Sequence, residues 1–330
     1  MINVAVIGVG AMGYNHARTY NKLPQTKLVA VCDLSKKLGK KVSREFGVPY
    51  YEDYKEMIAL EKLDAVSVVV PTKFHFPVSI VCMKKGLNVL VEKPITDSVE
   101  DAREMLRVAK KNNVHLMVGH IERYNPVVIS LQNFIKNKEF GKILSIVIKR
   151  VGLNAPKNAE VDVVTDLAIH DLDIIMAILG KYPNSVYAKG GSMISRDFMD
   201  HAEIFLDYQK FGCFIQVNWV TPIKIRTLSI TGTKGYAELN YLTQELNFYK
   251  HKREKKNVRR FEKFIAEYGK PEMTDVAIKK EEPLVVEIKF FCGMIESKIN
   301  NYKQAEESIN SLRLAVDVSD SIRAGRPVKL

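Results

Sequence analysis

The chain has 330 residues, 46% of them hydrophobic and 27% charged, as is typical of a folded globular protein with room for two domains. Its longest apolar run, 65–70, is far too short to cross a bilayer, which excludes a protein that spans a membrane with helices. The 50 basic and 38 acidic residues give a net charge of +12, which fits an anionic partner or simply a lysine-rich proteome, so charge alone identifies no partner.

Strand-like and helix-like segments alternate over the first 119 residues. The strands are almost entirely apolar, as in a parallel sheet that is covered on both faces. The alternation therefore predicts a doubly wound α/β sheet of the Rossmann type. The predicted strands are 3–7, 28–32, 65–70, 88–91 and 115–118, and the predicted helices are 12–23, 36–46, 74–85 and 99–112.

A glycine-rich run, GVGAMG, directly follows the first predicted strand and opens the first predicted helix. Gly8 permits a tight turn, Gly10 lets backbone amides approach a pyrophosphate, and Gly13 lets the helix pack closely on the strand. The helix N-terminus would face the phosphates with its N–H groups, so Ala11 and Met12 join the glycines as predicted cofactor-binding residues. The alternative is a turn that needs three glycines for backbone reasons only.

Asp33 lies at the end of the second predicted strand, twenty residues after Gly13. A carboxylate at this place accepts hydrogen bonds from the ribose hydroxyls of an adenosine and repels a 2′-phosphate. The sequence therefore favours NAD over NADP, although Lys36 and Lys37 follow closely and keep NADP open.

Two further loops follow strands at the carboxyl edge of the sheet, where open α/β sheets bind their ligands. One contains Pro71, Thr72 and His75, and the other is Glu92-Lys93-Pro94. Pro94 disfavours helical geometry at Lys93 and holds it extended at the strand end. Taken alone, the second loop could equally be a strand stop with a solvated lysine.

The segment 163–179 is predicted to be a helix that ends at Gly180. Asp166 and His170 are four residues apart, which would place them one turn apart on the same face. A carboxylate beside an imidazole forms a general acid/base pair, whereas the structural alternative is an aspartate that suits the helix dipole and a histidine that packs. Oxidation of a hydroxyl needs a base and an oxyanion donor, roles that suit His170 and Lys93, and no metal is required.

Short alternating segments follow and predict a mainly antiparallel sheet, over 185–193, 202–208, 212–219, 227–231, 236–240 and 245–249. A sheet of this kind with one apolar face needs a partner against it, either helices or another subunit, and we expect a homo-oligomer, either a dimer or a tetramer. The basic run 251–260 has no nucleic-acid-binding module around it and is interpreted as a solvated surface, not a nucleic-acid site. Helices over 284–300 and 305–324 complete the chain.

The four cysteines are scattered without any CxxC pair, which indicates reduced thiols and neither a disulfide framework nor a zinc site. A strand-like run begins at residue 2 with no signal-peptide pattern before it. We therefore expect a cytoplasmic protein, with a nucleotide-binding domain over 1–120 and a substrate-binding and oligomerisation domain over 121–330.

In this order and spacing, the motifs resemble those of the Gfo/Idh/MocA family of sugar and polyol oxidoreductases. The residues that carry the resemblance are the glycine loop, Asp33, the Pro71 to His75 loop, Glu92-Lys93-Pro94 and the pair Asp166 and His170. The resemblance implies a Rossmann domain and then an α/β domain with a large open sheet, with NAD as the cofactor. It also implies that Lys93, Asp166 and His170 are catalytic and that His75 and Glu92 lie at the cofactor site.

The segments 119–126 and 165–171 are more narrowly similar to the branch that oxidises the 3-hydroxyl of UDP-N-acetylglucosamine-type nucleotide sugars. The similarity implies a nucleotide-sugar substrate, for which Arg123, Asn125 and Arg150 are the predicted binding residues. Two departures stand out: Asp162 occupies a position where a glycine is expected, and the loop 154–159 lacks the usual arginine. A free sugar or inositol as substrate, or a non-catalytic NAD-binding regulator, remain the alternative hypotheses.

Overall fold

The structure is a computed structural model that describes residues 1–153, 162–194, 198–250, 272–297 and 301–330. Contacts divide the chain into two compact units. Unit 1 consists of Met1–Tyr124 and Glu282–Arg313, and unit 2 consists of Asn125–Glu281 and Leu314–Leu330. The loop 154–159 and the basic run 251–260, both singled out in the sequence, lie outside the described residues.

Unit 1 contains a six-stranded sheet in which every neighbouring pair of strands is parallel, in the order β3-β2-β1-β4-β5-β6. The order reverses at β1 and β4, so the loops that follow these two strands mark the ligand-binding edge of such a sheet. The strands are β1 (Ile2–Ile7), β2 (Thr26–Cys32), β3 (Tyr50–Tyr51), β4 (Ala65–Val68), β5 (Asn88–Glu92) and β6 (Leu116–Gly119).

The helices of unit 1 cover both faces of this sheet, which confirms the predicted Rossmann architecture. Side chains of β1 alternate between two buried clusters, with Ala5 and Ile7 in one and Val4 and Val6 in the other. The helices and short turns are α1 (Ala11–Lys22), α2 (Lys36–Phe46), α3 (Tyr54–Leu60), η1 (Thr72–Phe74), α4 (His75–Lys84), α5 (Val99–Asn112), η2 (Ile121–Tyr124) and α9 (Pro283–Ser297).

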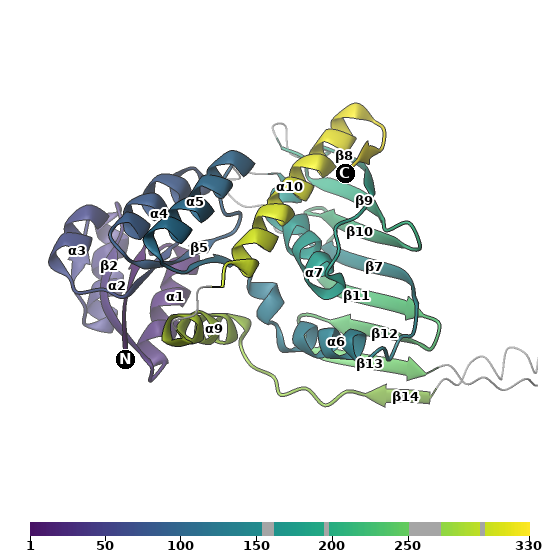
Figure 1. The fold of residues 1–330 in the computed structure, drawn as a ribbon, viewed down its shortest axis with the longest axis horizontal. Helices are drawn as coiled ribbons and strands as arrows, with labels where there is room; N and C mark the ends of the chain where they lie inside the picture. The colour runs from purple at the N-terminus through teal and green to yellow at the C-terminus, as the bar shows by residue number, and fades with distance from the viewer. Residues whose placement is uncertain (154–161, 195–197, 251–271, 298–300) are drawn as a thin grey trace, which may run out of the picture. The chain divides into compact units, whose positions relative to one another are not determined.

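The predicted elements of this half occur with their ends shifted by no more than two residues, whereas β3 and α3 were not predicted. The predicted division at residue 120 assigns helix α9 to the second domain. In the structure, α9 belongs to unit 1. Its apolar side chains Leu284, Ile288 and Phe291 share a buried cluster with Tyr20 of α1, beside which α9 lies in Figure 1. Helix α10 (Lys303–Ala324) contributes residues to both units.

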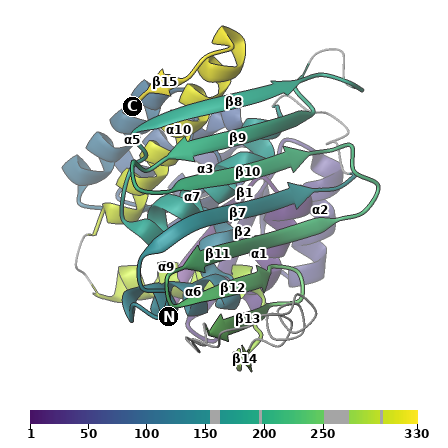
Figure 2. The same ribbon diagram turned by 90° about the vertical axis from the view of Figure 1, so that its right-hand side faces the viewer.

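Unit 2 contains a nine-stranded sheet in the order β14-β13-β12-β11-β7-β10-β9-β8-β15, seen face-on in Figure 2. Its strands pair antiparallel except for β7 and β10, which confirms a mainly antiparallel sheet. The strands are β7 (Ile143–Val151), β8 (Ser185–Gly191), β9 (His201–Asp207), β10 (Gly212–Asn218), β11 (Ile225–Gly232), β12 (Gly235–Asn240), β13 (Glu245–Lys250), β14 (Glu272–Asp275) and β15 (Val328–Lys329).

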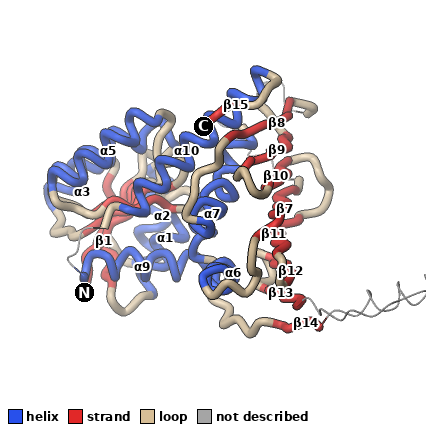
Figure 3. Tube along the Cα trace, turned by 45° about the vertical axis from the view of Figure 1, so that its right-hand side comes forward, coloured by secondary structure: helices blue, strands red, loops and turns tan. Residues whose placement is uncertain are grey.

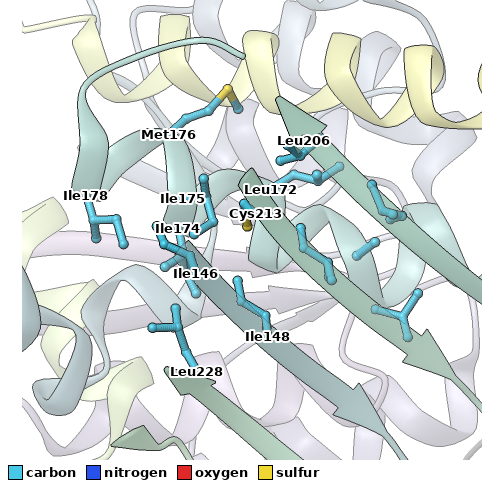
Figure 4. Close-up of a cluster of buried hydrophobic side chains, with 14 of the residues drawn as sticks. Ile146, Ile148, Leu172, Ile174, Ile175, Met176, Ile178, Leu206, Cys213 and Leu228 are labelled. Atoms are coloured by element: carbon cyan, nitrogen blue, oxygen red, sulfur yellow. The ribbon is translucent and has the colours of Figure 1, made fainter. Parts of the chain in front are cut away.

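One face of this sheet is covered by α6 (Pro126–Lys136) and α7 (Ile169–Leu179), which lie on the same side of the strands in Figure 3. Ile146 and Ile148 of β7 share a buried cluster with Leu172, Ile174 and Ile175 of α7, drawn in Figure 4. The central strand β7 and helix α6 were not predicted from the sequence.

Candidate active site

The glycine loop has the backbone geometry that its sequence predicts. Gly8 has a φ of +88°, and a Cβ there would lie 2.4 Å from the carbonyl oxygen of Val69. A Cβ on Gly13 would lie 1.8 Å from the carbonyl oxygen of Gly8, whereas a Cβ on Gly10 would meet nothing within 4 Å. Two glycines are thus required by close packing, and the third borders open space, as the approach of a ligand to the backbone needs.

The N-terminus of α1 suits an anionic ligand. Gly10 is its N-cap residue, with no capping hydrogen bond from a side chain, and the first turn, which includes Ala11 and Met12, holds no acidic residue. The helix dipole therefore meets no negative side chain of its own in this turn. These features fit the pyrophosphate of a dinucleotide.

Asp33 joins the loops that follow β1 and β2. Its Oδ2 accepts a hydrogen bond of 2.7 Å from the backbone N–H of Val9, and its Oδ1 accepts one of 2.7 Å from Ser35. The carboxylate is partly exposed and retains lone pairs for a ligand. Nearby, α2 carries an open hollow of about 540 Å³ lined by Lys36, Lys37, Lys40, Lys41, Arg44 and Glu45.

His75 links the two loops at the ends of β4 and β5. Its Nδ1 lies 2.9 Å from the carbonyl oxygen of Pro94, and its Nε2 lies 2.8 Å from that of Val70. Burial lowers the pKa of His75, and the two carbonyl contacts oppose this shift only in part. With a ring that is 1% exposed, His75 has the environment of a residue that holds the loops containing Pro71, Thr72 and Lys93.

Glu92 is held beside the backbone of Lys93. Its Oε1 lies 3.1 Å from Nε2 of His16, and its Oε2 accepts a 3.1 Å hydrogen bond from the Lys93 N–H. Burial by itself would raise the pKa of Glu92, but the hydrogen bond and charge of His16, with the charge of Lys93, lower it below the ordinary value. Lys93 is partly exposed at the end of β5.

Asp166 does not begin a regular α-helix, contrary to the prediction for 163–179. Residues Val164–Ala168 form a π-helical turn, and α7 begins at Ile169, so four residues no longer correspond to one α-helical turn between Asp166 and His170. Both side chains are partly exposed within unit 2. Single π-turns are frequent at functional sites, which favours a functional role for this segment.

Asp162, where a glycine was expected, caps this π-helical turn. Its Oδ1 accepts hydrogen bonds from the N–H of Val164 at 3.0 Å, from the N–H of Thr165 at 2.9 Å and from the Thr165 hydroxyl at 3.0 Å. An aspartate with such contacts satisfies N–H groups that a helix start leaves without intrahelical partners. The departure from the family pattern thus has a local structural explanation.

The three predicted substrate-binding residues have structural partners. Arg150 is buried and forms a bidentate ion pair with Asp171, with Nε–Oδ2 at 2.8 Å and Nη2–Oδ1 at 2.9 Å. Arg123 donates to Glu307 at 2.5 Å, and Asn125 caps α6 and donates to the carbonyl oxygen of Tyr241 at 3.1 Å. Each of the three side chains thus has at least one partner within the protein.

His16, Asp162 and Asp171 were not predicted as site residues. His16 lies three residues after Gly13, a position from which an α-helix reaches toward the sheet, and Asp171 directly follows His170. Among the described residues, no group of three or more His, Cys, Asp or Glu side chains is arranged to hold a metal ion. In that same part of the chain, no helix combines the length and apolarity needed to cross a membrane.

The fold and the glycine loop define a dinucleotide-binding oxidoreductase of two domains. Residues 2–120 match the model of the NAD-binding Rossmann domain of the Gfo/Idh/MocA oxidoreductases, and residues 133–330 match the model of their C-terminal α/β domain. The chain belongs to this family, which confirms the resemblance seen in its motifs.

Two relatives of known sequence and several solved structures extend the comparison. The chain is 29% identical to UDP-N-acetylglucosamine 3-dehydrogenase of Acidithiobacillus ferrooxidans over 75% of its own length and 77% of that protein. It is 31% identical to scyllo-inositol 2-dehydrogenase (NAD(+)) of Bacillus subtilis over 60% of each chain.

A structure of the Acidithiobacillus enzyme superimposes with a TM-score of 0.85 over 98% of both chains, at 26% identity. An oxidoreductase from Agrobacterium radiobacter in complex with NAD⁺, L-tartaric acid and magnesium superimposes with a TM-score of 0.85 over 99% of this chain and 98% of that one. At 19% identity, the second likeness concerns the fold alone.

The Arg150–Asp171 pair yields a prediction about stability. Both groups are buried, so Arg150→Met leaves an uncompensated carboxylate and is expected to lower the free energy of unfolding by about 3–5 kcal/mol. The double variant Arg150→Met/Asp171→Leu is expected to recover much of this loss, because no buried charge is left alone. Urea unfolding of the three proteins measures this, and a double variant as unstable as the single one would contradict it.

Proposed function

We propose that this protein oxidises a sugar hydroxyl to a ketone with NAD, at C3 of UDP-N-acetylglucosamine or a related nucleotide sugar. The observation that carries the proposal is the 29% identity to a UDP-N-acetylglucosamine 3-dehydrogenase over three quarters of the chain. The same enzyme's structure matches nearly the full length of both chains. The motif residues Lys93, Asp166 and His170, each partly exposed in its own unit, supply suitable chemistry.

The residues have separate tasks in this reaction. The glycine loop and the N-terminus of α1 would hold the pyrophosphate, and Asp33 the adenosine ribose. When bound, NAD supplies the acceptor for the hydride. His170 takes the hydroxyl proton as general base, Asp166 orients and tunes the imidazole, and Lys93 donates a hydrogen bond to the substrate oxygen on which charge develops.

A free sugar or inositol is the second candidate substrate class. The 31% identity to scyllo-inositol 2-dehydrogenase supports it, and the structural partners of Arg123 and Arg150 remove two arginines from an argument for phosphate recognition. A non-catalytic NAD-binding regulator is a third possibility. It would turn over no substrate of either class.

The deciding experiment follows NADH formation with UDP-N-acetylglucosamine, myo-inositol and glucose in parallel, with a carbonyl trap that removes product. We expect turnover with the nucleotide sugar. Turnover with the free polyols alone would replace the nucleotide-sugar proposal by the second candidate. No turnover with any substrate, combined with measurable NAD binding by calorimetry, would favour the regulator.

The catalytic roles predict a loss of turnover with little loss of cofactor binding. Lys93→Met and His170→Asn are each expected to lower kcat by at least about a hundredfold, because each removes a proton donor or acceptor of the chemical step. The double variant is expected to be little slower than either single one, since the two residues serve one step. Wild-type turnover in both single variants would refute the assignment, with NAD affinity as the control for folding.

The carboxylate of Asp33 predicts a preference for NAD over NADP. Asp33→Ser removes the charge that repels a 2′-phosphate and leaves Lys36 and Lys37 close in sequence, so the ratio of kcat/KM for the two cofactors is expected to shift toward NADP by about tenfold, or about 1.4 kcal/mol. Asp33→Asn is the matched control, because it retains an acceptor for the Val9 N–H. An unchanged ratio in both variants would show that Asp33 does not select the cofactor.

The uncovered face of the nine-stranded sheet supports a homo-oligomer. Val147, Phe214, Phe205 and Tyr187 lie side by side on four neighbouring strands and are 36–46% exposed. The adjacent row is polar and carries both signs of charge, with Lys149, Gln216, Glu203 and Lys189. A two-fold axis through such a face can place lysines opposite glutamates, so a second copy of this chain is the proposed partner.

This interface predicts a change in mass. Phe205→Glu places a charge in the middle of the apolar row and is expected to convert the oligomer into monomers, as measured by light scattering after gel filtration. Leu60→Glu changes an equally apolar side chain, 67% exposed on α3, and is expected to leave the mass unchanged. A Phe205→Glu protein with the wild-type oligomeric mass would exclude this face.

A further inference from the structure

A line of hydrogen-bonded side chains in unit 1 begins on α1, the helix that follows the glycine loop, and has no role in the reaction as described. His16 of α1 is 0% exposed, with its Nδ1 3.1 Å from Oγ of Ser67 in β4 and its Nε2 3.1 Å from Oε1 of Glu92 in β5. The hydroxyl of Tyr20, one turn further along α1, lies 2.8 Å from the same Ser67 oxygen. The chain therefore connects one helix to two strands.

The chemistry of the partners fixes the donor at the glutamate end of this hydrogen-bond chain. Because the Glu92 carboxylate can only accept, Nε2 of His16 must be the donor in that contact. In the neutral ring, Nδ1 accepts from the Ser67 hydroxyl, which in turn accepts from the Tyr20 hydroxyl. In the protonated ring, Nδ1 donates to Ser67 and Ser67 donates to Tyr20, while the Nε2 donation to Glu92 is the same. Glu92 is therefore the terminal acceptor of the line Tyr20–Ser67–His16–Glu92 in both states of the ring.

This line of hydrogen bonds ends at the backbone N–H of Lys93. One Glu92 oxygen faces His16, the other accepts the Lys93 N–H, and a Cβ on Gly119 of β6 would lie only 3.0 Å from Oε1. The carboxylate is therefore held on three sides. The side chain of Glu92 is only 12% exposed, so its carboxylate is largely desolvated at a cost that an apolar residue would not incur, and a stability role alone does not explain it.

We propose that His16 is a positioning residue for Lys93, which acts by fixing Glu92 and hence the peptide from which the lysine side chain extends. This inference rests on the proposed catalytic role of Lys93. It assigns a task to a buried histidine that contacts neither the reacting atoms nor the cofactor in this scheme. We expect loss of the contact between His16 and Glu92 to lower kcat and to leave the KM for NAD unchanged. The orientation of the Lys93 side chain affects the chemical step, whereas NAD binding does not depend on it in this scheme.

Two substitutions separate the two sides of the imidazole. The amide nitrogen of a glutamine can take the place of Nε2, so His16→Gln retains the donor to Glu92 and loses the contact with Ser67. The amide of an asparagine can take the place of Nδ1, so His16→Asn does the reverse. We expect His16→Asn to lower kcat at least about tenfold and His16→Gln to stay within about threefold of wild type.

Tyr20→Phe is the control for a general effect of disturbing the chain, since it removes only the far hydroxyl, and its kcat is expected to stay within about threefold of wild type. A second readout needs no turnover. Hydrogen exchange of the Lys93 amide in the cofactor-free protein is expected to be faster in His16→Asn than in His16→Gln, because only the first loosens its acceptor.

The outcomes distinguish this inference from the proposed function. Wild-type kcat in His16→Asn, or equal losses in His16→Asn, His16→Gln and Tyr20→Phe, would overturn the positioning role. The Lys93→Met variant is measured beside them. If Lys93→Met retains full turnover, the catalytic assignment fails first; if it is inactive while His16→Asn is fully active, only the inference about His16 fails.

Discussion

The parallel pairing of β1 with both β2 and β4 is the constraint on which the candidate cofactor site depends. It directs the chain away from the sheet at one edge, so the glycine loop and the loop after β2 emerge side by side. Asp33 then joins them through two backbone N–H groups, and His75 joins the next two loops through two backbone carbonyls. The loops of the candidate site are thus held together by contacts between two side chains and backbone groups of these loops.

The sequence predicted five of the six parallel strands of unit 1, although not β3, α3 or the place of α9, because the signals of those five strands are local. Each strand is a short apolar run followed by its own helix, so a window of some thirty residues contains the whole βαβ unit. In unit 2, β7 pairs with β10 and β11, whose partner residues are more than sixty positions away. No residue near β7 in the sequence indicates this pairing, and its run ILSIVIKRV lacks the strict alternation of apolar and polar residues by which a half-buried strand is predicted. Buried and exposed residues nevertheless alternate along most of β7 in the structure.

The candidate site residues divide in a similar way. Gly8 and Gly13 could be singled out because their roles follow from backbone geometry and neighbouring residues. The partners of Arg123 and Arg150 could not, because Glu307 and Asp171 approach them through tertiary packing. An arginine usually pairs with an anionic group, but the sequence does not show which one. Only the fold decides whether that group is a carboxylate of the protein or a phosphate of a substrate.

The π-helical turn before α7 explains how one segment serves both a buried core and a partly exposed site. In a regular α-helix, Asp166 and Asp173 would share a face, since seven residues make nearly two turns. They differ in the structure: Asp166 is partly exposed, and Asp173 is completely buried. The wider turn over Val164–Ala168 offsets the first residues from those of α7. Within α7, consecutive residues point about 100° apart, so Asp171 pairs with Arg150 in the core while its neighbour His170 is partly exposed.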